Sequence, residues 1–188
     1  MTDENQSRRV RMTKRLMKDA LLELLEQNEL AKISVTAVCD AADVHRSTFY
    51  KYYTSTSNLL EEIEQDFLSR IPFPPKKINQ QTQEQLLIET TAFFDFVKQN
   101  EKAFRILFSD SVGNSFTARI EDYLCSGFIP ILTIEDKQNA VYIQRYIAHG
   151  TVGLLKEWVK AGFPVSSHRI AEMMYFLSRK IVSGPLSH

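Results

Sequence analysis

The feature that most constrains the fold is the stretch 34–53, whose pattern predicts two short helices joined by a tight turn. Ser34 is a residue type that caps helix starts, and Val38 and Ala42 fall on one apolar face at helical spacing. Asp43 tolerates the left-handed conformation that a tight turn requires. We therefore expect a first helix followed by a tight turn over Ala41-Ala42-Asp43-Val44.

The second helix of this stretch is predicted to begin near His45 or Arg46. Phe49 and Tyr53 lie four residues apart and are expected to pack inward, which leaves a row of hydrogen-bond donors facing solvent. This arrangement is a helix-turn-helix, and one α-helix fits the major groove of DNA, where base edges display donors and acceptors. The residues assigned to DNA contact are Thr36, His45, Arg46, Ser47, Thr48, Tyr50, Lys51, Tyr52 and Thr56.

These residues are given different roles. Arg46 is the predicted base contact, since its planar fork matches guanine O6 and N7. Thr36 is expected to meet a phosphate at a helix start. His45 either caps the second helix or contacts DNA, and Thr48 either starts that helix or reaches DNA.

The motif resembles the DNA-binding domain of TetR-family transcription regulators over roughly residues 10–62. The residues that carry the resemblance are Thr36, Ala42-Asp43-Val44, Arg46-Ser47-Thr48-Phe49-Tyr50, Tyr52-Tyr53 and Leu59-Leu60. Asp43 replaces the glycine usual in the family, and Thr56 replaces a lysine that often contacts phosphate. An ordinary helical hairpin is the alternative, and so is an interaction protein that has lost DNA binding.

Charge is informative through its distribution. The formal net charge is +0, which argues against a nonspecific binder of polyanions. A basic run without an intervening acid nevertheless precedes the motif, and it predicts a local footprint for phosphate, with a solvated charged end as the alternative. The run comprises Arg8, Arg9, Arg11, Lys14, Arg15 and Lys18.

The fold class predicted from helical periodicity is all-α. Prolines at positions 72, 74 and 75 deny a helix its donors and mark a domain boundary. The predicted divisions are a helix-turn-helix domain over 8–56, a connecting helix over 57–71, a linker over 72–81 and a helical ligand-binding and dimerisation domain over 82–184. Residues 1–7 are polar and predicted to be disordered.

The C-terminal domain is rich in aromatic residues at helical spacing, which are expected to fill the core for the most part. A ligand pocket is the alternative, and an effector would be small and apolar. His149 is expected to be buried with its hydrogen bonds satisfied. The candidate pocket residues are Phe94, Phe104, Phe108, Tyr123, Tyr146 and His149.

The last two helices combine small residues with an apolar face wider than one domain needs. They predict a homodimer through a four-helix bundle, as the family resemblance also implies. A dimer supplies two recognition helices, so the operator is expected to be a palindrome. The interface candidates are Gly150, Gly153, Met173, Met174, Leu177 and Ile181.

Other classes of function find little support in the sequence. It holds no phosphate-binding glycine loop, no nucleophile with a matching base and no metal-ligand spacing, and Cys39 and Cys125 have no partner at such spacing. We expect no enzyme activity, metal or cofactor. No apolar run is long enough for a membrane span, and the expected location is the cytoplasm.

The resemblance implies a repressor that leaves DNA when an effector binds the C-terminal domain. The pattern 43–50, together with Gly150 to Trp158, resembles a branch of the family with a compact C-terminal domain. Members of that branch are thought to answer to protein partners or to activate transcription. An open cavity would favour a small molecule, and a filled core would favour a protein co-regulator.

Overall fold

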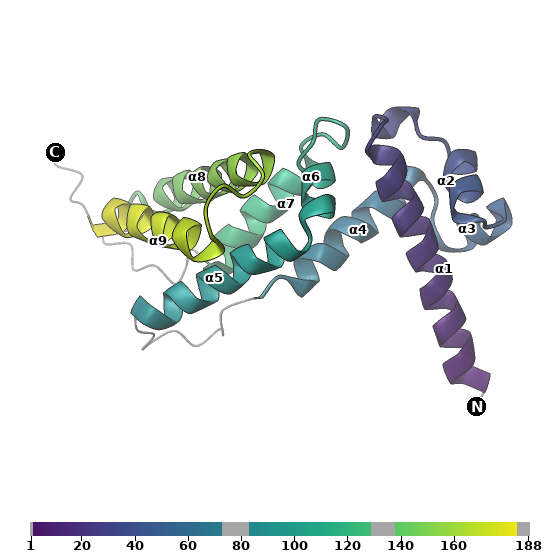
Figure 1. Ribbon diagram of the computed structural model, residues 1–188, viewed down its shortest axis with the longest axis horizontal. Coiled ribbons are helices and arrows are strands. Elements are labelled where there is room, and N and C mark those ends of the chain that lie inside the picture. The colour runs from purple at the N-terminus through teal and green to yellow at the C-terminus, as the bar shows by residue number, and fades with distance from the viewer. Residues whose placement is uncertain (1, 73–82, 129–137, 184–188) are drawn as a thin grey trace. The chain divides into compact units, whose positions relative to one another are not determined.

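The computed structural model describes residues 2–72, 83–128 and 138–183, and all regular elements in these ranges are helical (Figure 1). This confirms the predicted all-α class. The described residues form two compact units that are treated separately below. The first unit comprises Met1–Ser69 with Ile106–Gly113, and the second comprises Arg70–Arg105 with Asn114–His188.

The first unit contains four helices and one 3-10 turn among its described residues. They are α1 (Thr2–Leu25), η1 (Leu30–Lys32), α2 (Val35–Ala42), α3 (Arg46–Tyr52) and α4 (Thr56–Arg70). The predicted disorder of residues 1–7 is wrong from Thr2 onward, because α1 already begins there. Extending an existing helix costs far less than nucleating a new one, so a polar start can continue α1.

The core of the first unit forms where α1, α2 and α3 meet, and Figure 1 shows α2 and α3 beside α1. Met17 and Leu21 of α1 are 0% exposed there, and Ile63 of α4 is 2% exposed. Phe49 is 0% exposed and Tyr53 is 2% exposed, which confirms that both belong to the core. Burial of each such side chain contributes about 1.5–3 kcal/mol before entropy is subtracted.

The segment 106–113 completes the first unit, although it lies far along the chain. The backbone N–H of Leu30 donates to the carbonyl oxygen of Ser111 at 2.9 Å. The loop after α1 therefore has its hydrogen-bond partner in a segment that begins with the last two residues of α6 (Glu101–Leu107).

The second unit is built from helices α5 to α9. They are α5 (Gln83–Gln99), α6 (Glu101–Leu107), α7 (Ser115–Tyr123), the π-helical turn η2 (Leu124–Phe128), α8 (Ala140–Lys160) and α9 (Ser167–Ser183). Helix α5 packs along α9, and α8 contacts both α7 and α9 (Figure 1). The linker predicted over 72–81 and the predicted end of the C-terminal domain at 184 lie outside the described residues, apart from Pro72.

Aromatic rings in edge-to-face contact fill the second unit's core. Phe94 meets Trp158 with ring centroids 5.4 Å apart, and Phe104 meets Phe116 at 5.7 Å. The indole N–H of Trp158 donates to the carbonyl oxygen of Val165 at 3.0 Å, so its polar atom is satisfied. The prediction that most aromatic residues serve the core is confirmed for these four.

The ends of α8 and α9 follow their sequence signals. Helix α8 ends at Lys160, and Gly162, just beyond the C-cap Ala161, adopts φ +76°. Glycine takes this left-handed conformation without a Cβ penalty, which suits it to the end of a helix. Ser166 then accepts a hydrogen bond from the N–H of Arg169 at 3.2 Å, which caps the start of α9. No helix in the described ranges is long and apolar enough to cross a membrane.

Candidate nucleic-acid interface

The turn between α2 and α3 has the geometry predicted for it. Ser34 caps α2 by accepting a hydrogen bond from the N–H of Ala37 at 3.1 Å. Asp43 ends the helix in the left-handed conformation, with φ 51° and ψ 48°. The N–H of Val44 then donates to the carbonyl oxygen of Cys39 at 3.0 Å, which closes the turn.

His45 caps the start of α3, the first of the two roles considered for it. Its Nδ1 accepts a hydrogen bond from the N–H of Ser47 at 3.4 Å and lies 2.9 Å from the Ser47 hydroxyl oxygen. A ring nitrogen that accepts from a backbone N–H is unprotonated, so in neutral His45 the proton sits on Nε2. The exposed ring therefore presents an N–H donor to solvent.

The solvent face of α3 carries the donors that the sequence assigned to DNA contact. Arg46, Ser47, Tyr50 and Lys51 are exposed. The guanidinium of Arg46 lies 6.0 Å from the ring centre of Tyr50, at the outer limit of a cation–π contact. Tyr50 itself is 52% exposed, an unusual position for an aromatic ring in a small domain.

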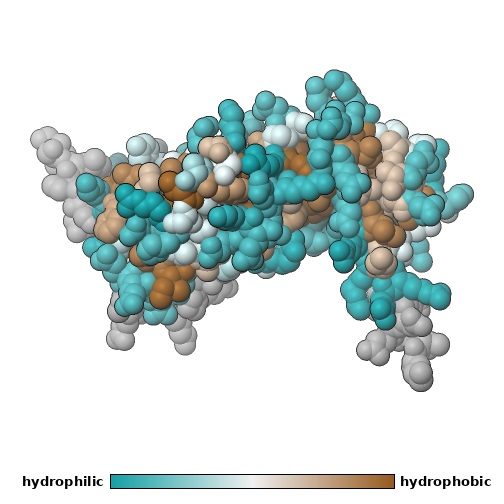
Figure 2. All heavy atoms as spheres, viewed as in Figure 1, coloured by the Kyte–Doolittle hydropathy of each residue, from teal (hydrophilic) through white to brown (hydrophobic). Residues whose placement is uncertain are grey.

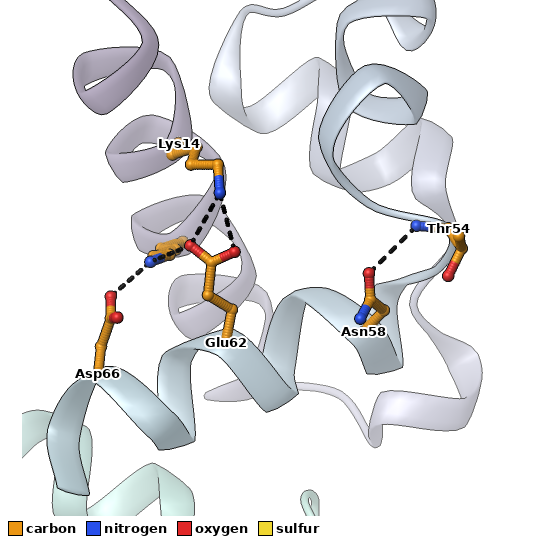
Figure 3. Close-up of polar contacts among 6 residues, drawn as sticks. Lys14, Thr54, Asn58, Glu62 and Asp66 are labelled. Carbon is orange, nitrogen blue, oxygen red and sulfur yellow. Dashed lines mark hydrogen bonds and ion pairs between the residues drawn. The ribbon is translucent and has the colours of Figure 1, made fainter. Parts of the chain in front are cut away.

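The remaining predicted contacts lie at the edges of this face. Thr36 is exposed on the first turn of α2, whereas Thr48, Tyr52 and Thr56 are half-buried. A rigid entry to α4 lies beside Thr56. There the N–H of Asn58 donates to Ser55 Oγ at 3.1 Å, and Asn58 Oδ1 accepts from the N–H of Thr54 at 3.3 Å (Figure 3).

The basic run of α1 divides into exposed and paired residues. Arg8 and Arg9 are exposed, and Arg15 lies 3.5 Å from Asp19. Lys14 and Lys18, in contrast, form ion pairs with carboxylates of α4, and Figure 3 shows Lys14 facing Glu62. The predicted footprint is thus not uniform along the helix.

The acids that meet these lysines were missed by the sequence reasoning. Glu62 and Asp66 sit four residues apart on α4, as Lys14 and Lys18 do on α1, and this matched spacing was the available signal. Partial burial opposes charge on Glu62, yet hydrogen bonds from Lys18 and Lys14 hold its pKa below the usual range. Burial likewise opposes charge on Lys18, and bonds to Asp66 and Glu62 nevertheless raise its pKa.

The six candidate pocket residues differ in their surroundings. Phe94 and Phe104 are fully buried among other rings, whereas Tyr146 is 67% exposed on α8. Phe108 is half-buried and belongs to the first unit. Tyr123 is half-buried, its hydroxyl lies 3.5 Å from the carbonyl oxygen of Ile71, and burial raises its pKa.

His149 is not the buried histidine that was expected. Its side chain is 61% exposed, and its Nδ1 lies 2.8 Å from a carboxylate oxygen of Glu121 on α7. Helical spacing places His149 three residues after Tyr146, on the same outward-facing side of α8. Within the described residues, no group of three or more histidine, cysteine or acidic side chains is placed to hold a metal.

A groove of about 440 Å³ runs between α8 and α9 and contains most of the interface candidates. Gly150 and Gly153 lie on its α8 side, and a Cβ built on either would meet no atom within 4 Å. Met173 is not among the lining residues but is 38% exposed on α9. Apolar residues reach the surface of the second unit in Figure 2. The candidates that line the groove are Gly150, Gly153, Met174, Leu177 and Ile181.

A helix-turn-helix followed by a unit of packed helices defines an all-helical transcriptional regulator. Residues 84–180, more than half of the chain, match the family model TetR_C_8, described as a transcriptional regulator C-terminal region. The chain belongs to the TetR family of transcriptional regulators. No curated protein matches the sequence.

Solved structures share the fold at low sequence identity. A TetR transcriptional regulator from Streptococcus agalactiae 2603V is 20% identical with a TM-score of 0.71, and the match covers 93% of this chain and 98% of that one. A putative TetR-family regulator from Syntrophomonas wolfei is 16% identical, with a TM-score of 0.64 and coverages of 93% and 96%. The dihydroxyacetone kinase operon activator DhaS is 18% identical, with a TM-score of 0.61 and coverages of 90% and 96%.

Proposed function

We propose that the protein is a dimeric repressor that binds a palindromic operator in the cytoplasm and is released by an effector acting on its C-terminal unit. The observation that carries the DNA-binding part is the solvent face of α3. Arg46, Ser47, Tyr50 and Lys51 are exposed there on a short helix that is held by a capped and closed turn. A surface of fixed donors on one helix is what major-groove recognition needs.

The α8–α9 groove supports the dimer. TetR regulators bind DNA and act as dimers, and five of the six interface candidates of this chain line one groove. Open space around Gly150 and Gly153 leaves room for a helix from a second copy to approach closely. Leu177 is 55% exposed beside them, so association would remove apolar area from water.

Control by a protein partner is the second candidate, and one observation favours it over a small-molecule effector. Phe94 and Phe104 are 0% exposed and held in ring contacts, so both already fill space that a ligand would have to enter. An effector of either kind must bind more tightly to the conformation whose two α3 helices are wrongly spaced for the operator. Otherwise it does not change the balance between bound and free DNA. Titrating an operator complex with cell extract and with its small-molecule fraction separates the two.

The DNA-binding proposal is tested by fluorescence anisotropy on the DNA upstream of the protein's own gene. Wild type is expected to bind this duplex more tightly than random DNA, with an affinity that falls as salt rises. Arg46→Ala is expected to weaken specific binding by about 1–3 kcal/mol, because a bidentate contact to guanine is lost.

Arg169→Ala is the matched control, since Arg169 lies on α9 and pairs with Glu172 at 3.1 Å. It should leave operator binding unchanged. Equal loss from both variants, or no sequence preference of wild type on tiled genomic DNA, would remove the proposal. A reporter gene behind the operator decides the direction of control, since DhaS, a structural relative, is described as an activator.

A further inference from the structure

One ammonium group in the first unit touches three helical elements. Lys14 on α1 reaches both carboxylate oxygens of Glu62 on α4, at 3.2 Å and 3.0 Å. The same Nζ atom lies 5.7 Å from the ring centre of Tyr52 and 5.3 Å from that of Tyr53. Tyr52 is the last residue of α3 and Tyr53 is its C-cap. Lys14 thus joins α1, the end of α3 and α4, and Figure 3 shows its contact with Glu62.

The surroundings of Lys14 favour an internal role over contact with a phosphate. Its side chain is 31% exposed and that of Glu62 is 30% exposed, whereas Arg15 on the same helix is 77% exposed. Lys18 adds a second cation, 2.7 Å from Glu62, and also pairs with Asp66. Both lysines therefore have carboxylates in contact before any DNA arrives.

Tyr53 makes this contact consequential for α3. Its ring is 2% exposed and packs at 5.7 Å from Phe49, which anchors the inner face of α3. Burial and the neighbouring Glu62 carboxylate raise the pKa of Tyr53, so the ring sits in the field of the same ion pair. A shift of Lys14 or Glu62 would be felt at the C-terminal end of the helix that carries Arg46.

We propose that Lys14 and Glu62 are positioning residues for operator binding, which hold α3 at a fixed angle between α1 and α4. This inference rests on the proposed function. Lys14 contributes to affinity because it positions the donors on α3. Its own positive charge is paired with Glu62 and does not contact a phosphate. The lysine that sequence position assigned to the phosphate footprint thus acts inside the protein.

The two roles for Lys14 predict different responses to charge reversal. A phosphate contact depends on the positive charge at position 14 alone, and its loss lowers the salt dependence by about 0.9 in log–log slope. A positioning pair depends on opposite charges at positions 14 and 62, and it does not matter which position carries the positive charge. Lys14→Glu should therefore be rescued by Glu62→Lys only if the pair positions α3.

The experiment measures operator affinity against salt for wild type, Lys14→Glu, Glu62→Lys and the double reversal. Each single change is expected to weaken binding by at least about tenfold, because a charged hydrogen-bonded pair is broken. The double reversal should recover part of that loss, with the salt slope of wild type, because it restores the pair with position 14 while Lys18 loses Glu62 and keeps only Asp66. No recovery in the double variant would overturn the proposal.

Arg9→Glu combined with Glu62→Lys is the matched control. Arg9 is exposed on the same helix, so this pair of changes has the same net charge as the double reversal without the facing ion pair. It should stay weak. Equal recovery in both doubles would show that net charge alone sets affinity and would overturn the proposal.

Hydrogen exchange across residues 46–58 of the full chain tests the inference without DNA. Lys14→Glu and Glu62→Lys are expected to speed exchange at the end of α3 and at the Thr54–Asn58 turn, and the double reversal should slow it again. Unchanged exchange in both single variants would overturn the inference. If wild type binds no operator, the proposed function fails while these exchange rates still decide whether the pair positions α3.

Discussion

At the scale of single residues, Asp43 shows how one backbone conformation sets the turn of the helix-turn-helix. It holds φ 51° between α2 and α3, a conformation costly for most side chains but tolerated by aspartate. The family resemblance expects glycine here, and the structure shows that aspartate keeps the same turn. The geometry of the turn, and not the glycine itself, is the requirement.

This gives a prediction for Asp43→Ala. Alanine has no side-chain oxygen to stabilise the left-handed conformation, so the free energy of unfolding should fall by about 1 kcal/mol. Urea unfolding followed by circular dichroism measures it. Asp43→Gly is the control and should be at least as stable as the alanine variant. A stable Asp43→Ala protein would mean that the turn relaxes to negative φ.

Residues also show where sequence reasoning succeeds and where it stops. Phe49 and Tyr53 were assigned to the core correctly, because periodicity within one helix defines its inner face. The pairing of Lys14 with Glu62 joins positions 48 apart and depends on how two helices approach. The prediction that His149 is buried was wrong, because one helix has a side that faces the core and a side that faces solvent, and residue type alone did not tell them apart.

At the scale of elements, helix limits were predicted well where a cap marks them. Ser34 and Asp43 each act as expected, since capping is decided by neighbours in sequence. The start of α1 was not predicted, because a polar segment carries no local signal that separates disorder from continuation of a helix. The candidate pocket residues were chosen by residue type, which does not specify direction on a helix.

The groove between α8 and α9 carries a prediction of its own. Leu177→Asp places a charge in an apolar surface that a second copy would cover, so dimerisation should weaken by at least about tenfold. Analytical ultracentrifugation over a range of concentrations measures the effect. Ile88→Asp is the control, since Ile88 is 62% exposed on α5 and does not line the groove. A dimer that survives Leu177→Asp would place the interface elsewhere.

At the scale of the whole molecule, the proposed dimer would present two helix-turn-helix units to one operator, and both can bind only if the half-sites are correctly spaced. Joining two weak contacts through one dimer raises affinity by about 10²–10⁴ over a single half-site. Insertion of about five base pairs between half-sites turns one site to the opposite face of DNA. Affinity should then fall to that of a single half-site.

Gel shifts on the natural operator, the lengthened operator and a single half-site make this comparison. An operator of natural length with a scrambled spacer is the control and should retain most of its affinity. Equal binding to the natural and lengthened operators would mean that each copy reads DNA independently. Leu177→Asp should bind all of these duplexes about equally, which links the two predictions.

The bond from Leu30 to Ser111 bears on how such a protein can be recombined. The first unit is made from two stretches of chain, Met1–Ser69 and Ile106–Gly113. A chimera that exchanges only the leading stretch would inherit a loop whose backbone donor met its acceptor in the part left behind. A chimera that exchanges the first unit between relatives is therefore expected to fold best when residues 106–113 are exchanged together with Met1–Ser69.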